Sequence, residues 1–148
     1  ATRRVTCLMH PHSYLNKVCI GFSNGDLELW NLRSKTHLHS FGATLHKSIR
    51  NNAGGFTLTI AGQRNALLDQ RQTGAPPSIT CVEQSPAVDV VAVGMSDGRI
   101  VLHNLKFDES VVTFLQDDGA VTTLSFRTGT AITSSVSLSS QHSTYSCQ

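Results

Sequence analysis

A segment of twelve residues occurs twice in this chain, and this internal repeat constrains the fold more than any other feature. The first copy is Gly21-Phe-Ser-Asn-Gly-Asp-Leu-Glu-Leu-Trp-Asn-Leu32, and the second is Gly94-Met-Ser-Asp-Gly-Arg-Ile-Val-Leu-His-Asn-Leu105. Upstream, Val5-Thr-Cys-Leu8 corresponds to Ile79-Thr-Cys-Val82, and a third copy begins at Val121-Thr-Thr-Leu124. Repetition of this kind indicates stacked structural units, so the chain is predicted to be a repeat protein.

Each copy is predicted to contain four short β-strands, because apolar runs alternate with polar turns. The expected strands cover residues 5–9, 17–22, 26–32 and 37–41 in the first copy, and 79–83, 90–94, 99–105 and 111–115 in the second. Asn24-Gly25 predicts a type I′ hairpin turn, in which both central residues take positive φ, and Asp97-Gly98 marks the equivalent turn. The 42 residues from Ile79 to Val121 fit a four-stranded propeller blade. The predicted fold class is all-β, a propeller fragment with two four-stranded blades and the first strand of a third.

Residues 42–78 interrupt the repeat, because 74 residues separate Val5 from Ile79. This segment lacks a hairpin signal, so we predict a flexible insertion between the first blade (residues 1–41) and the second blade with the start of the third (79–128). Residues 56–61 could form an isolated strand and residues 63–72 a short helix. Its positive side chains are weak candidates for contacts with RNA phosphates: Lys47, Arg50, Arg64 and Arg71.

The C-terminal segment, residues 129–148, differs in composition from the rest of the chain. It is rich in Ser and Thr, contains no Asp, Glu, Lys or Arg, and lacks the Asp-Gly turn that a third blade requires. We therefore predict a disordered Ser/Thr-rich tail. The chain begins at Ala1 rather than Met, and we expect it to be a partial or truncated chain.

Charge and composition exclude few functions on their own. The chain has 12 Lys and Arg against 10 Asp and Glu, and a net charge of +2 does not by itself favour nucleic acid or an anionic membrane. No apolar run reaches the roughly 18 residues of a membrane helix, so we expect no membrane contact and an intracellular location. The four cysteines form no Cys-x-x-Cys pair, so we expect buried, reduced thiols.

The sequence contains no pattern typical of an enzyme. His10 and His12, like His37 and His39, would project to one face of a strand, but no further ligand stands at a suitable spacing, so we expect surface histidines. No Gly-x-Ser-x-Gly motif is present, and Gly54-Gly55 is not part of a phosphate-binding loop. We therefore expect no catalytic residue, metal, cofactor or small-molecule substrate.

The repeated segment resembles WD repeats, in which a turn Asp, a strand Trp, a strand Ser or Thr and a loop His can share hydrogen bonds. The first copy has Thr6 and Trp30, and the second has Thr80 and Asp97 with His103 at the Trp position. The resemblance implies structural roles for Thr6, Trp30 and Thr80 in strands, and for Asn24, Gly25, Asp97 and Gly98 in turns. Because the polar set is incomplete in each copy, we expect apolar packing to hold the blades together.

Longer strings are similar to the family of WD-repeat subunits of the small-subunit processome that associate with the U-three small nucleolar RNA. The strings are His10-Pro-His-Ser-Tyr-Leu-Asn-Lys-Val18, Leu27-Glu-Leu-Trp-Asn-Leu-Arg33, Glu83-Gln-Ser-Pro-Ala-Val-Asp-Val-Val-Ala-Val-Gly94, His103-Asn-Leu-Lys-Phe-Asp-Glu109 and Ser125-Phe-Arg-Thr128. The resemblance implies a non-enzymatic scaffold in the nucleus and nucleolus, acting in pre-rRNA processing and small ribosomal subunit biogenesis. Its implied partners are other processome proteins and the pre-ribosomal ribonucleoprotein, contacted mostly through protein.

Three other interpretations stay open for such a chain. The first is a general protein-interaction adaptor, such as a ubiquitin-ligase receptor or a signalling scaffold. The second is direct RNA binding through residues 42–78, and the third is a non-functional truncated product.

Overall fold

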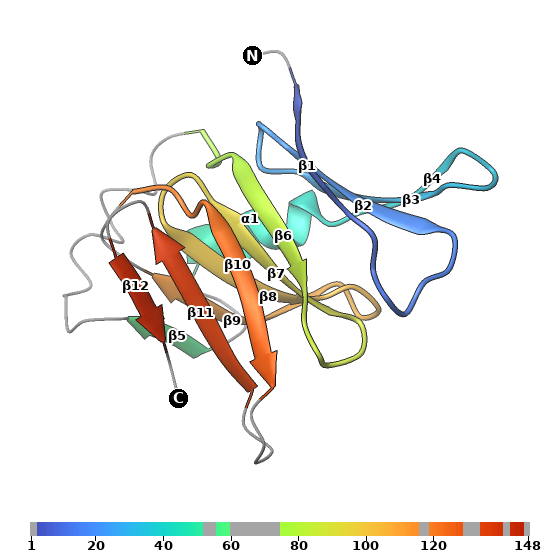
Figure 1. Ribbon diagram of the computed structural model, residues 1–148. Helices are drawn as coiled ribbons and strands as arrows, with labels where there is room; N and C mark the ends of the chain where they lie inside the picture. Colours follow the sequence, from blue (N-terminus) through green and yellow to red (C-terminus); the bar gives the residue numbers. More distant parts are fainter. Residues whose placement is uncertain are drawn as a thin grey trace.

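The strands of the chain form three β-sheets, shown in Figure 1 as a computed structural model. The structure describes residues 3–51, 56–59, 75–115, 119–128, 134–140 and 143–146. The first sheet contains, in sequence order, the antiparallel strands β1 (Val5–Met9), β2 (Lys17–Phe22), β3 (Leu27–Asn31) and β4 (Thr36–Ser40). The second contains β6 (Ile79–Gln84), β7 (Val90–Met95), β8 (Arg99–Asn104) and β9 (Glu109–Leu115), with β5 (Phe56–Thr59) added parallel to β9. The third contains β10 (Thr123–Thr128), β11 (Ser134–Ser140) and β12 (Ser143–Ser146).

The two predicted blades are confirmed. The first sheet is the first blade, and strands β6 to β9 are the second, each with its four strands in the predicted order. The repeat extends to irregularities of pairing: the register shifts between Val5 and Cys7 on β1 and between Ile79 and Cys81 on β6. The duplicated sequence therefore encodes the same bulged sheet twice.

The structure describes regular elements in parts of residues 42–78 and 129–148, and the flexibility of the insertion and the disorder of the tail stay predictions. Helix α1 (Gly42–Asn51) directly follows the first blade, and Leu45 anchors it with a fully buried side chain. The described part of the expected isolated strand, Phe56–Thr59, pairs with β9 and is therefore not isolated, while the expected helix at 63–72 lies outside the described residues. In the tail, β11 and β12 extend the third sheet to three strands, since an uncharged Ser/Thr-rich segment can pair with a free strand edge.

The hairpin turns keep their predicted positions but not their predicted type. Gly25 N–H donates to the Phe22 carbonyl oxygen at 3.1 Å, and Gly25 has a φ of 83° whereas Asn24 does not have a positive φ. Ser23 and Asn24 are therefore the central residues, followed by a left-handed glycine, which is the three-residue loop with a G1 bulge rather than a type I′ turn. The second blade repeats it, with Gly98 at φ 88° and its N–H donating to Met95.

The hydrophobic core lies between the first two sheets. Cys19, Leu27 and Leu29 of the first sheet pack with residues of the second, which include Ile79, Val82, Val91, Val93 and Met95. A second cluster joins the second sheet to the third through Ala92, Ile100, Val121 and Leu124. Each sheet therefore uses one face to pack against the next, as propeller blades do.

Two equivalent glycines let the sheets approach each other closely. A Cβ atom on Gly21 would lie 2.8 Å from Ile79 Cγ2, and one on Gly94 would lie 2.7 Å from Val121 Cγ1. Real Cβ atoms do not come so close to a neighbour, so the space that a side chain would need is occupied by Ile79 on β6 and by Val121, two residues before β10. Cys7 Sγ and Cys81 Sγ of the same sheets also occupy it, at 2.5 and 2.6 Å from the two Cβ positions. The repeated glycine therefore sets the distance between blades. Within the described part of the chain, no helix has the length and apolar character needed to cross a bilayer.

Candidate functional site

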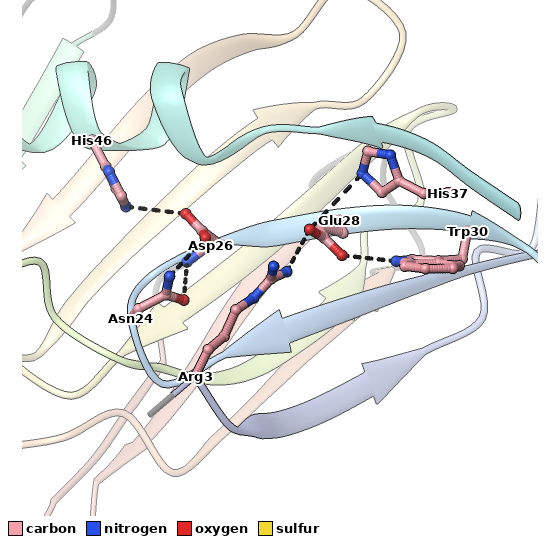
Figure 2. Close-up of polar contacts among 7 residues, drawn as sticks. All are labelled: Arg3, Asn24, Asp26, Glu28, Trp30, His37 and His46. Atoms are coloured by element: carbon pink, nitrogen blue, oxygen red, sulfur yellow. Dashed lines mark hydrogen bonds and ion pairs between the residues drawn. The ribbon is translucent and has the colours of Figure 1, made fainter. Parts of the chain in front are cut away.

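Three groups of polar side chains link strands, turns and blades, and the first is centred on Glu28 of β3. Leu27 and Leu29 face the second sheet, so Glu28 points to the opposite face of the first sheet. Trp30 Nε1 donates to Glu28 Oε2 at 2.8 Å, Arg3 forms an ion pair with Oε1, and His37 Nε2 lies 3.9 Å from the same oxygen, as Figure 2 shows. Arg3 also stacks on Phe22, with its guanidinium 3.7 Å from the ring centroid.

The environment of Glu28 keeps this carboxylate charged although it is only 7% exposed. Burial raises the pKa of Glu28, but the hydrogen bonds from Trp30 and Arg3 and the charge of Arg3 outweigh it, so the pKa is below its ordinary value. This network covers part of the sheet face that points away from the second blade. Arg3, Trp30 and His37 all contact Glu28, so we assign this network a structural role.

The described contacts of Trp30, Thr80 and His103 are with residues outside the hydrogen-bond set that the WD resemblance implies. The single indole N–H of Trp30 donates to Glu28, and Thr6 lies on β1, two strands away from Trp30. The Thr80 hydroxyl lies 3.9 Å from Cys81 Sγ, and His103, at the Trp position, contacts Ser110. Thr6, Trp30 and Thr80 are therefore placed on the predicted strands but are not brought together.

The predicted turn residues form the second polar group, at the hairpin tips. Asn24 Nδ2 donates to Asp26 Oδ2 at 2.7 Å, and His46 Nε2 of α1 lies 3.8 Å from Asp26 Oδ1 (Figure 2). In the second blade, Asp97 Oδ1 accepts from the backbone N–H of Arg99 at 3.2 Å, and its other oxygen lies 2.8 Å from Arg99 Nε. In each hairpin, the side chain of the residue before the turn glycine therefore forms a hydrogen bond with the residue two positions further along the chain, which stabilises the turn.

The third group joins the two blades around Asp108, in the turn between β8 and β9. Its Oδ2 lies 2.9 Å from His39 Nε2 on β4, and its Oδ1 lies 3.2 Å from Nε2 of His103, which is fully buried. His103 Nδ1 lies 3.3 Å from the Ser110 hydroxyl oxygen. Phe41 packs edge-on against both rings, with centroids 4.7 Å from His39 and 5.2 Å from His103.

A β-bulge decides which histidine takes part in this contact. On β4, His39 pairs with Leu29 and His37 with Trp30, so two strand positions on β4 correspond to one on β3. His37 and His39 therefore point to opposite faces, and the expectation that they share one face is wrong. Both are exposed, as predicted, and His10 and His12 are exposed as well. Among the side chains that the structure describes, no group of His, Cys, Asp and Glu is suited to a metal ion.

The cysteines are free where the structure describes them, and they are less uniformly buried than predicted. Cys19 is fully buried, whereas Cys7 and Cys81 are half-buried at equivalent positions on β1 and β6. Burial raises the pKa of Cys19 to about 12 and raises the pKa of the other two as well. These thiols are therefore protonated and poor nucleophiles. Cys147 lies outside the described residues.

The four candidate RNA contacts are not brought together by the described structure. Lys47 is exposed on α1, and Arg50 lies further along the same helix. Arg64 and Arg71 lie outside the described residues.

The sequence reasoning missed Asp108 and Glu28, which organise two of the three polar groups. A signal for Asp108 exists in the repeat, because Lys35 and Asp108 occupy the same position after the strand, and both have a positive φ, 57° and 51°. Asn31 and Asn104 also match, since each side-chain oxygen accepts two backbone N–H groups of the following turn. The repeat therefore predicts the turn that contains Asp108. It does not predict the contact of Asp108 with His39 of the first blade.

Comparison with known proteins places these blades in one family. The model of the WDR36/Utp21 first β-propeller matches residues 1–144. Human WD repeat-containing protein 36 is 33% identical over 125 residues, covering 84% of this chain and 10% of that protein. The U3 small nucleolar RNA-associated protein 21 homolog of Schizosaccharomyces pombe is 37% identical over 132 residues, covering 88% of this chain and 11% of that protein.

Solved structures share the fold at low sequence identity. The crystal structure of RRP9 WD40 repeats has a TM-score of 0.59 at 16% identity, over 90% of this chain and 32% of that one. A chain of the mitotic checkpoint complex has a TM-score of 0.58 at 14% identity, over 92% of this chain and 32% of that one. The chain spans about a tenth of the length of the two curated relatives, and its match over residues 1–144 is to a propeller domain. The chain therefore belongs to the family of the WDR36/Utp21 first β-propeller.

Proposed function

We propose that the chain is a non-enzymatic WD-repeat scaffold of the small-subunit processome, located in the nucleolus and acting in pre-rRNA processing and small ribosomal subunit biogenesis. The match of residues 1–144 to the WDR36/Utp21 first propeller carries this proposal. A relative with 37% identity is named for its association with U3 small nucleolar RNA, which supports the same role. The partners are other processome proteins and the pre-ribosomal ribonucleoprotein.

The polar groups support a scaffold rather than an enzyme. Ser110, His103 and Asp108 follow one another in the order of a nucleophile, a base and an acid. Ser110 is only 4% exposed and His103 is fully buried, so a substrate carbonyl cannot reach the hydroxyl. The chain of contacts therefore serves to join the blades.

Purification of the affinity-tagged chain from cells, with sequencing of the bound RNA and mass spectrometry of the bound proteins, tests the proposal. We expect enrichment of pre-ribosomal RNA and of processome proteins. Enrichment of ubiquitin-ligase or signalling components instead would assign the chain to another WD adaptor system, and enrichment of neither would indicate a non-functional product.

A nuclease arm separates protein contacts from RNA contacts. If protein contacts dominate, the processome proteins stay bound after RNase treatment, and a variant with Lys47, Arg50, Arg64 and Arg71 changed to Ala binds them as the unchanged chain does. Loss of all partners in both arms would show that the chain binds RNA directly through residues 42–78.

A further inference from the structure

Exposed apolar side chains gather on the loops at one end of the two blades. Leu15 is 91% exposed in the β1–β2 loop, and Leu32 is 53% exposed at the start of the β3–β4 turn. In the second blade, Val88 is 73% exposed in the β6–β7 loop and Phe107 is 69% exposed in the β8–β9 turn. Figure 1 shows these four loops to the right and lower right of the sheets. We call this surface the loop rim.

Hydrogen bonds join the loops of the rim into one surface. Leu32 N–H donates to the Asn16 carbonyl oxygen at 2.7 Å, which ties the two loops of the first blade together. Leu105 N–H donates to the Asp89 carbonyl oxygen at 2.7 Å and does the same in the second blade. Tyr14 of the first blade donates its hydroxyl hydrogen to the Asp89 carboxylate of the second. The exposed side chains are therefore carried on loops that hold one another in place.

The repeat presents the exposed aliphatic side chains at matching positions. Leu15 lies two residues before β2, and Val88 lies two residues before β7. An exposed leucine or valine on a monomer surface is ordinary when it is single, but grouped apolar side chains indicate a surface that is covered by another molecule. The rim carries four such side chains on adjoining loops.

The charged groups of the rim favour an acidic occupant. Lys17 lies 4.3 Å from the centroid of the Tyr14 ring, and Lys106 lies 5.4 Å from that of Phe107. Arg33 and Lys35 are exposed in the β3–β4 turn. The acids of the same loops are Asp89, Asp108 and Glu109, of which Glu109 at the start of β9 is exposed and the other two are half-buried against Tyr14 and against His39 and His103. Three of the four cations are exposed against one of the three acids, so the surface of the rim presents more positive than negative charge.

We propose that the loop rim docks an acidic segment of a partner protein, whose apolar side chains cover Leu15, Leu32, Val88 and Phe107 while its carboxylates face the rim lysines and Arg33. This proposal rests on the scaffold function and adds the surface and the chemistry of the partner. RNA is less well matched, because bases stack on aromatic rings and three of the four exposed side chains are aliphatic. Apolar anchors within a polar rim are the usual composition of a protein–protein contact.

Fluorescence anisotropy with defined probes tests the proposal on the full chain. The first probe is a labelled sixteen-residue peptide of alternating Asp/Glu and Leu/Phe residues. Three comparison probes are the same peptide with Lys in place of the acids, the same peptide with Ser in place of the apolar residues, and a single-stranded RNA of equal negative charge. We expect saturable binding of the first probe only.

Single substitutions inside and outside the loop rim show where on the chain the peptide binds. Leu15→Ser and Phe107→Ser should each weaken binding about tenfold, since each removes an exposed apolar side chain from the contact. Leu8→Ser is the matched control, because Leu8 is 65% exposed on β1 and outside the rim, and it should leave binding unchanged. All three side chains are exposed, so the variants should keep the fold.

Other outcomes would overturn the proposal. Tighter binding of the RNA probe would assign the rim to nucleic acid, equal binding of the Lys peptide would remove the role of charge, and no binding of any probe would leave the rim without a docking role. The peptide titration does not depend on ribosome assembly. A chain that binds the peptide but purifies without pre-ribosomal RNA would therefore refute the processome assignment and keep the docking surface.

Discussion

Nε2 of His39 on β4 lies 2.9 Å from Oδ2 of Asp108 in the β8–β9 turn, and this contact ties the outer strand of the first blade to the second blade. Asp108 also faces His103, so one carboxylate contacts a histidine from each blade. The blades therefore share a polar contact in addition to the apolar core between them.

Asp108→Asn should destabilise the chain at neutral pH. Burial raises the pKa of Asp108, but hydrogen bonds with His39 and Thr44 and the charges of the two histidines outweigh it, so the pKa is below its ordinary value of 3.8. A carboxylate with a lowered pKa contributes stability above its unfolded value, and the contribution is lost as pH falls through the folded value. Urea midpoints should therefore differ at pH 7 and converge as pH falls below 3.8; a constant difference would contradict this account.

His103→Gln should flatten the fall in stability under mildly acidic conditions. Burial lowers the pKa of His103 from 6.5 to about 4, although the charge of Asp108 acts in the opposite direction. The unfolded chain then binds more protons than the folded one between these values, so stability falls as pH falls from 6.5 to 4, by up to about 3 kcal/mol. Unfolding free energies of both chains across this range give the comparison, and equal slopes would show that His103 is not buried in its neutral form.

Gly94→Ala should destabilise the chain by about 1–3 kcal/mol, because the added methyl group would lie 2.7 Å from Val121 Cγ1. Val121→Ala in the same chain should recover part of the loss, since it removes Cγ1, while Cys81 Sγ at 2.6 Å and the Cβ of residue 121 at 3.0 Å remain close to the added methyl group. A double-mutant cycle measured by urea unfolding gives the coupling between the two sites. Additive effects would mean that Gly94 does not set the distance between the second and third sheets.

Gly25→Ala should cost more than Asn24→Ala. Gly25 has a φ of 83°, and a Cβ atom there would lie 2.8 Å from the Pro77 carbonyl oxygen, so we expect a loss of at least about 1–2 kcal/mol. Asn24→Ala removes a hydrogen bond to Asp26 and should cost about 1 kcal/mol or less. Thermal midpoints rank the two variants, and an equal or larger effect at Asn24 would favour the type I′ turn instead.

The architecture was predictable because the sequence repeats, and a repeat fixes strand order and blade size together. The turn glycines and the matching Asn31 and Asn104 belong to the same local pattern. Contacts between distant segments were not predictable: the pairing of β5 with β9 and the contact of His39 with Asp108 depend on tertiary packing. Helix α1 also escaped prediction, because Leu45 is its one fully buried side chain among those described.

The histidines show why the polar groups were harder to predict than the strands. An i, i+2 pair on a regular strand shares one face, but the bulge in β4 separates His37 from His39. A bulge adds one residue without any marked change of composition, so its position follows from pairing with β3 rather than from the sequence of β4. The candidate site was therefore found only in part.

Sedimentation of the chain in cell extracts tests the central claim most directly. In a density gradient, the tagged chain should migrate with the large particles that contain pre-ribosomal RNA, and a Gly94→Val variant, in which the sheets cannot pack, should stay in the slowly sedimenting fractions. Co-migration that depends on the packed blades is the result this account predicts. A wild-type chain found wholly in the slow fractions, apart from pre-ribosomal RNA, would contradict it.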